Sequence, residues 1–309
     1  MSCGDTVRTP EAITITRTAL AHPGCPVVSL ASVPRASATL AVWASAWLAG
    51  AAAPDDVLDS LAPWSQAHDV LATDADTAEW TGVPGPGSAP TSITMLLAAL
   101  RRITPRGQAR LVLPAPGDVR GLPGPGPFSR EATAAGEGIL FPEAGFGVVP
   151  SDIADGVVRW TVYRVPDPGP VPEYVALNQA EADLREQVRT SASVLTDLGV
   201  ARHRPGVREE IAAALRSRPR SLWPAGMPPR ALRVLQQADE VDAILAAAAG
   251  DELGGWQEAE PTGRGEYGAL SASAADARSE ALRPIETAVR VARRAAVAEA
   301  VRILVSVPT

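Results

Sequence analysis

The spacing of hydrophobic and polar residues changes near residue 166 and divides the chain into two parts. Before that point, residues 11–18 and 156–165 alternate hydrophobic and polar side chains with the two-residue period of a β-strand. Apolar runs predict further strands at 25–33, 109–114 and 138–150. Helical patterns lie between them, at 38–54, 54–64 and 89–103. This mixture predicts an α/β or α+β domain with a mixed sheet.

Beyond residue 176 the hydrophobic residues recur every three or four positions, which is the spacing of helices that pack in a bundle. Helices are predicted at 184–198, 234–248 and 284–306. Pro284 is placed in the first turn of the last helix, after a long acidic loop at 251–268. Four prolines between 166 and 172 mark a linker. The sequence therefore predicts an α/β domain at 1–166, a Pro-rich linker at 167–176 and an all-α helical bundle at 177–309.

The apolar segment 38–54 is interpreted as a buried helix and not as a membrane span. As a helix it would be about 25 Å long, which is shorter than the ~30 Å hydrocarbon core of a bilayer. Leu40, Trp43 and Trp47 share one face and form its predicted packing stripe. The small residues at its end resemble a cleavage site, so export stays an alternative.

All 28 basic residues are arginines, and Asn178 is the sole asparagine, as is typical of a high-GC bacterial genome. Without lysine the chain has no Schiff-base amine, no anchor for pyridoxal phosphate and no Walker-type or kinase-type phosphate lysine. These chemistries are excluded, and we predict no cofactor.

Few residues in the chain could ligate a metal. The candidates are Cys3, Cys25, His22, His68 and His203. A turn imposed by the neighbouring prolines accounts for His22 and Cys25 without a metal, so no metal site is predicted. A Cys3–Cys25 disulfide remains an alternative. The low cysteine content favours the reducing environment of the cytoplasm.

Glycine and proline alternate in the stretch at 117–138, which follows a predicted strand and leads into a predicted helix. Such a loop resembles a phosphate cradle, but its prolines have no N–H to donate. We interpret it mainly as a connector in which Ser129 caps the following helix, as Thr91 or Ser92 does after a similar stretch at 81–95. The alternative is a site for a small carboxylate or phosphate. Its ligand-binding residues would be Asp118, Arg120, Ser129, Arg130 and Glu131.

Ten arginines and four carboxylates lie between residues 185 and 233, so this segment is strongly basic within a chain of net charge −7. It could meet an acidic protein, the acidic first part of the same chain, or a nucleic acid. The prolines at 219, 224, 228 and 229 argue against the tight turn of a DNA-binding helix-turn-helix, so nucleic acid is the less favoured partner. The predicted partner-binding residues are Arg204, Arg208, Arg216, Arg218 and Arg220.

These observations favour a non-catalytic interaction or regulatory protein that acts through its helical domain, by binding a protein partner or by self-association. Binding or conversion of a small anion at the 118–131 loop is the first alternative. Nucleic-acid binding through residues 202–233 is the second. No catalytic residue is assigned.

Overall fold

The computed structural model describes residues 36–170, 174–197, 209, 212–213, 215–216, 223–254 and 266–306. The strands predicted at 11–18 and 25–33 lie outside these residues, as do Cys3, Cys25, His22 and His203. The described residues belong to one compact unit.

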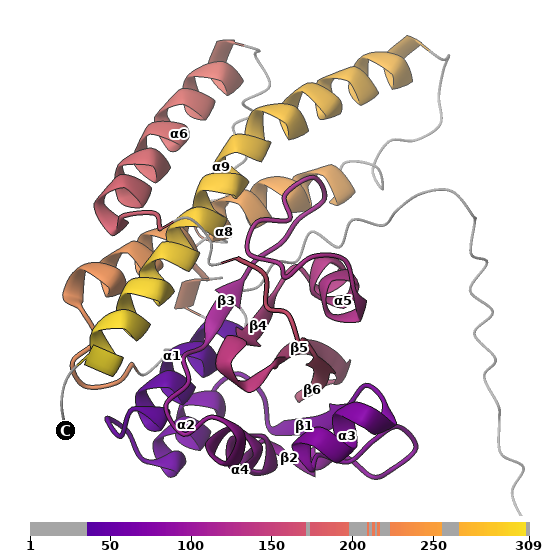
Figure 1. Ribbon diagram of the computed structural model, residues 1–309. Coiled ribbons are helices and arrows are strands. Elements are labelled where there is room, and N and C mark those ends of the chain that lie inside the picture. The colour runs from indigo at the N-terminus through magenta and orange to yellow at the C-terminus, as the bar shows by residue number, and fades with distance from the viewer. Residues whose placement is uncertain are drawn as a thin grey trace, which may run out of the picture. The chain divides into compact units, whose positions relative to one another are not determined.

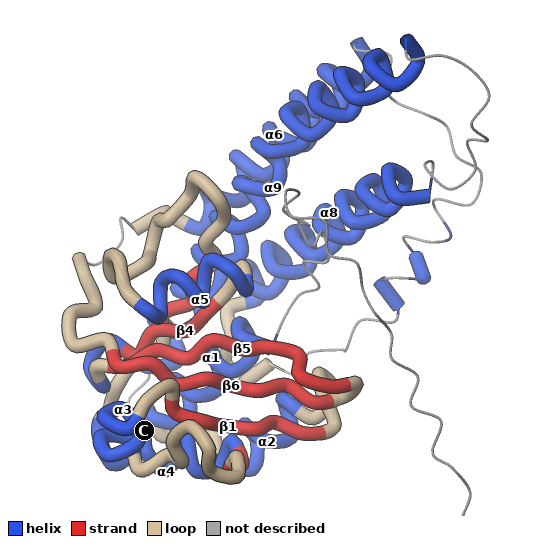
Figure 2. The backbone as a smooth tube through the Cα atoms, turned by 90° about the vertical axis from the view of Figure 1, so that its right-hand side faces the viewer, coloured by secondary structure: helices blue, strands red, loops and turns tan. Residues whose placement is uncertain are grey.

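Six strands form one mixed sheet (Figure 2). They are β1 (Ala67–Ala72), β2 (Thr91–Ser92), β3 (Arg110–Val112), β4 (Gly138–Phe141), β5 (Phe146–Ala154) and β6 (Val157–Arg164), in the spatial order β2-β1-β6-β5-β4-β3. The β1–β6 pair is parallel, and every other pair in the sheet is antiparallel. The predicted fold class, a mixed sheet with helices followed by a helical region, is confirmed.

Helices accompany this sheet throughout the first part of the chain. They are α1 (Ala36–Leu48), α2 (Pro54–Leu61), α3 (Ala75–Thr81), α4 (Ile93–Ile103) and α5 (Pro127–Ala135), with a short 3-10 helix, η1 (Pro142–Ala144). The start of α2 follows from Pro54, whose missing N–H is not needed at the first helical position, and from Asp56, whose carboxylate accepts the Ala53 N–H.

The predicted buried helix at 38–54 is confirmed as α1, although its burial is wider than one stripe. It contacts α2, α9, β3 and β4, so residues on all its faces are buried. Small side chains such as Ala41 and Ala44 allow this close approach. No helix in the described part of the chain is both long enough and apolar enough to cross a membrane.

The helical region contains α6 (Leu177–Asp197), α8 (Pro229–Gly254) and α9 (Glu266–Ser306), and α9 packs against both others (Figure 1). The placement of Pro284 in a first turn is wrong, because α9 begins at Glu266 and carries Pro284 inside it. The predicted loop at 251–268 is also too long, because α8 continues to Gly254. The high alanine content of both helices offsets the free-energy cost of Pro284 within α9 and of the glycines near the end of α8.

The sequence missed β1 and α3, which follow one another. Strand β1 carries His68 and Asp69 at half-buried positions, so its hydrophobic pattern is weak. It is nevertheless an inner strand, because β6 pairs with it along its whole length. Helix α3 is short, and its N-cap residue is Asp74, whose side chain accepts the Thr77 N–H at 2.7 Å.

Trp160 and His68 join the sheet to α2 through a half-buried chain of hydrogen bonds. The Trp160 indole N–H donates to His68 Nδ1 at 3.1 Å, and His68 Nε2 donates to the Leu61 carbonyl at 3.0 Å. An accepting Nδ1 and a donating Nε2 define one neutral tautomer of the imidazole. Burial lowers the pKa of His68, and the bond to Leu61 opposes that shift in part.

We expect the free energy of unfolding to decrease as the pH falls below about 6.5, where the unfolded histidine takes up a proton. The folded imidazole resists protonation, so the stability from His68 is complete above that pH and is lost below it. Urea unfolding of the protein and of His68→Gln, which keeps polar atoms but does not titrate, measures this contribution. Equal pH dependence in both proteins would contradict the prediction.

Candidate functional site

The loop between β3 and α5 is shaped by a small turn. Ala115 and Asp118 exchange two backbone hydrogen bonds of 2.8 and 2.9 Å. These bonds fix the backbone conformation at Asp118. Gly121 follows with φ of +89°, a conformation that favours glycine. A Cβ atom at Gly121 would lie 3.4 Å from Nη1 of Arg294, so this glycine also lets the loop approach α9 closely.

Helix α5 begins after Gly126, and Pro127 occupies its first turn. The expectation that Ser129 is the N-cap is therefore wrong. Ser129 is buried inside the helix, and its hydroxyl donates to the Gly124 carbonyl. The preceding helix start was predicted correctly in position, because Ser92 is the N-cap residue of α4, although its side chain makes no capping hydrogen bond.

Three arginines and one aspartate meet where this loop contacts α9, and we call them the arginine cluster: Asp118, Arg120, Arg290 and Arg294. Arg120 binds the Asp118 carboxylate through Nε at 2.7 Å and Nη2 at 2.8 Å. Nη2 of Arg290 lies 3.6 Å from the same carboxylate. Arg294 Nη1 donates to the Arg120 carbonyl at 2.7 Å. Figure 1 shows the loop beside α9.

Positive charge exceeds negative charge in the arginine cluster. The hydrogen bond from Arg120 lowers the pKa of Asp118 to about 2, so this carboxylate is ionised at neutral pH. Burial lowers the pKa of Arg294, Asp118 opposes that effect, and repulsion from Arg120 and Arg290 adds to it. The Nε atoms of Arg290 and Arg294 are buried and have no hydrogen-bond partner among the described residues. One carboxylate thus faces three guanidinium groups, two of which are partly desolvated.

Ion pairs connect the helices of this region, and one of them holds α9 against α8. Arg293 donates to Asp239 at 2.7 Å and to Asp242 at 3.1 Å, both on α8. Glu181 of α6 accepts from Arg230 of α8 at 2.8 Å. Because Arg293 is bound to α8, the adjacent Arg294 is fixed on the side of the helix that meets the loop.

The structure brings only part of the predicted ligand-binding set together. Asp118 and Arg120 lie in the arginine cluster, whereas Arg130 and Glu131 are exposed on α5 and take no part in the described contacts of the cluster. Glu131 lies near Tyr163, where burial first and then the charge of Glu131 raise the pKa of the phenol.

Sequence reasoning missed Arg290 and Arg294 altogether. They occur in a segment read only for its apolar stripe, although their separation of four residues places them on one face of a helix. That spacing was the available signal. Nothing in the sequence showed that this face meets residues 118–121.

The predicted partner-binding surface is mostly outside the described residues. This applies to Arg204, Arg208, Arg218 and Arg220. Arg216 is among the described residues, where it is helical and exposed. The role of this segment stays a prediction.

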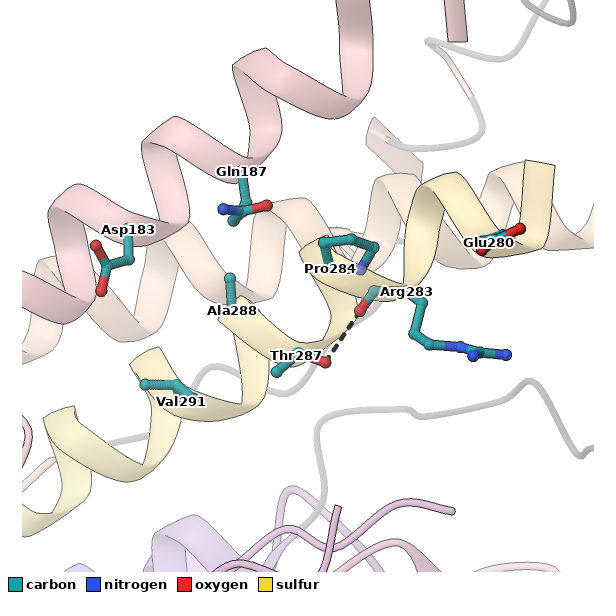
Figure 3. A pocket seen from close by; sticks show the side chains of 8 residues that line it. All are labelled: Asp183, Gln187, Glu280, Arg283, Pro284, Thr287, Ala288 and Val291. Atoms are coloured by element: carbon teal, nitrogen blue, oxygen red, sulfur yellow. Dashed lines mark hydrogen bonds between the residues drawn. The ribbon is translucent and has the colours of Figure 1, made fainter. Parts of the chain in front are cut away.

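A groove of about 600 Å³ lies between α6 and α9 (Figure 3). Ala288 and Val291 form apolar lining, and Asp183, Gln187 and Glu280 contribute polar groups. Pro284 cannot donate to the carbonyl four residues before it, so the groove is next to a gap in the hydrogen bonds of α9. The Asp183 carboxylate is already bonded to Gln179 at 2.7 Å. Arg283 also lines the groove, so two carboxylates are offset by one guanidinium there, and the groove has less unbalanced charge than the arginine cluster.

No group of three or more histidine, cysteine or acidic residues within the described part of the chain is placed to hold a metal ion.

Two family profiles match this chain side by side. The N-terminal domain of the Rv1486c-like proteins matches residues 37–174, and the C-terminal domain of the same family matches residues 178–294. The chain belongs to the Rv1486c-like family. Its two-domain organisation is that of the family, while the boundaries predicted at 166 and 177 stay a prediction.

Mycobacterial relatives in the Rv1486c-like family resemble the chain over most of its length. The uncharacterized protein Rv1486c of Mycobacterium tuberculosis is 38% identical over 290 residues, which cover 84% of this chain and 95% of the relative. The uncharacterized protein ML1804 of Mycobacterium leprae is 33% identical over 300 residues, with the same coverage of each chain. No solved structure matches the chain.

Within this family framework the arginine cluster joins the two domains. Asp118 and Arg120 lie in the segment that matches the N-terminal domain, and Arg290 and Arg294 lie in the segment that matches the C-terminal domain. A ligand at the cluster would contact both.

Proposed function

We propose that this protein is a non-catalytic binding protein for a small anion, which it holds at the arginine cluster. The observation that carries the proposal is the charge imbalance around Asp118: Arg120 and Arg290 pair with its carboxylate, and Arg294, which donates to the Arg120 carbonyl, adds a third positive charge beside them. Placing like charges together costs free energy, and an additional anion reduces that cost. Guanidinium groups are also the donors best suited to carboxylate and phosphate oxygens.

The donors in this site are side chains and not the backbone of the loop. Pro123, Pro125 and Pro127 have no N–H, so the loop cannot form the row of backbone donors found in phosphate-binding loops. The positive φ of Gly121 instead serves to bring the loop against Arg294. The loop thus acts as a connector and also delivers Arg120 to the site.

A calorimetric titration with sulfate tests this function. We expect the protein to bind sulfate, and we expect Arg290→Gln and Arg294→Gln each to weaken binding by about tenfold, because each removes a charged donor. Arg189→Gln is the matched control, since it removes an equal charge from an exposed ion pair on α6. Its affinity should equal that of the unchanged protein.

Two results would contradict the proposal. One is a lack of sulfate binding by the unchanged protein at low ionic strength. The other is an equal effect of all three substitutions, which would show a non-specific dependence on net charge. Circular dichroism of each variant shows whether the fold is kept.

A second candidate function is protein interaction or self-association through the helical domain. Val194 of α6 is 39% exposed and Ile244 of α8 is 46% exposed, so both helices present apolar side chains to solvent. Light scattering across a concentration series tests self-association. If these residues form the contact, Val194→Glu and Ile244→Glu shift the protein toward the monomer, and an unchanged mass would count against it. With this candidate we also propose a cytoplasmic location, on the basis of the low cysteine content. We expect nucleic acid to bind only weakly.

A further inference from the structure

We propose that the anion held at the arginine cluster is the terminal phosphate of an organic phosphate monoester. This inference rests on the proposed function and narrows its ligand to one chemical class. It is carried by three features of the cluster: its net charge, the arrangement of its donors and the apolar side chain beside it.

The net charge of the cluster matches a dianion. Arg120, Arg290 and Arg294 carry three positive charges, and Asp118 neutralises one of them. A phosphate monoester carries close to two negative charges at neutral pH, whereas a diester or a carboxylate carries one. The side chain of Arg290 is only 19% exposed, so water screens its charge poorly. The second negative charge of the ligand therefore adds to the binding free energy.

The donors are arranged for a tetrahedral group. Arg290 and Arg294 are one turn apart on the same face of α9. Their guanidinium groups can therefore bind different oxygens of one ligand. Arg120 reaches the same place from the loop, where its carbonyl already accepts from Arg294. A planar carboxylate has two oxygens and satisfies one guanidinium fork, while a terminal phosphate has three oxygens to share among several.

An apolar neighbour favours an ester over free phosphate. Val119 lies between Asp118 and Arg120 in the turn, and 65% of it is exposed to solvent. An organic group attached to the phosphate can cover this side chain, which free phosphate cannot do.

Titration at constant ionic strength tests the charge requirement. At about pH 7.5 we expect methyl phosphate to bind at least about tenfold more tightly than dimethyl phosphate, which has one charge. The preference should shrink toward about pH 5, because the second pKa of a monoester is about 6. Asp118, whose pKa is about 2, stays ionised over this range. Sulfate, which stays a dianion, should therefore bind equally at both pH values. Glu286 lies one turn before Arg290 on α9, and any effect of its charge would appear in the sulfate titration as well.

A second comparison tests the ester. Phenyl phosphate should bind more tightly than inorganic phosphate, and Val119→Ser should remove that difference without changing the affinity for inorganic phosphate. Equal affinity for methyl and dimethyl phosphate, or for phenyl and inorganic phosphate, would overturn the inference. In either case, continued binding of sulfate that depends on Arg290 and Arg294 would leave the proposed function standing. Loss of sulfate binding itself is the failure of the proposed function.

Discussion

Replacing Trp160 with alanine should lower the free energy of unfolding by about 3–5 kcal/mol, the range for deleting a large aromatic side chain from a core. Trp160 is fully buried in β6, between β1 on one side and β5 on the other. Its removal leaves a cavity in the middle of the sheet and also takes a donor from His68 Nδ1. Chemical denaturation with fluorescence or circular dichroism measures the loss.

Trp80→Ala is the matched control for this substitution. Trp80 is 43% exposed, and its ring contacts the guanidinium of Arg164 at 5.4 Å from the ring centroid. An exposed cation–π contact contributes about 0.5–1 kcal/mol, so this variant should be destabilised far less. Similar losses for the two tryptophans would show that Trp160 does not act through burial in the core.

The sequence was informative where local pattern and tertiary environment agree. The strand at 156–165 and the helix at 89–103 alternate or repeat as their burial requires, and both were found. The strand at 67–72 was missed because its inner position in the sheet depends on pairing with β6, nearly ninety residues later in the chain. Pairing of this kind is set by the whole fold and leaves a weak local signal.

Pro284 shows the opposite failure. A proline is a strong local signal for a helix boundary, and the sequence was interpreted that way. Helix α9 nevertheless continues through Pro284. It can do so because, from Ile285 onward, it packs against the core of the protein. Tertiary packing outweighed the loss of one backbone hydrogen bond.

Half of the candidate site could be predicted in the same sense. Asp118 and Arg120 were singled out because charged residues follow a strand in a glycine-rich loop. Arg290 and Arg294 approach them from a helix about 170 residues later, as the hydrogen bond between Arg294 and Arg120 spans 174 positions. No pattern within either segment encodes that meeting, so it emerged only from the folded chain.

Substituting Arg293 with alanine should destabilise the protein by about 3 kcal/mol, because it removes one partner from a buried ion pair. The side chain of Arg293 is 12% exposed and that of Asp242 is 8% exposed. Burial lowers the pKa of Arg293, but the charges of Asp242 and Asp239 outweigh it and raise the pKa, which shows how strongly the aspartates stabilise the cation. Arg189→Ala, which breaks an exposed pair on α6, should cost less than about 1 kcal/mol.

The Arg293 variant also separates the support of the site from the site itself. Arg293 binds α8 while its neighbour Arg294 faces the loop, so losing Arg293 should loosen α9 and weaken sulfate binding. The side-chain hydrogen bonds described for Arg293 go to α8 and not to the cluster. The triple variant Arg293→Leu, Asp242→Leu and Asp239→Asn removes the three charges together. It should recover much of the stability that Arg293→Ala loses. If α9 is then held by apolar packing, sulfate affinity should recover with it. Recovery of stability without recovery of binding would mean that the ion pair fixes the rotation of α9, and Arg293 would then be a positioning residue and more than a stabilising one.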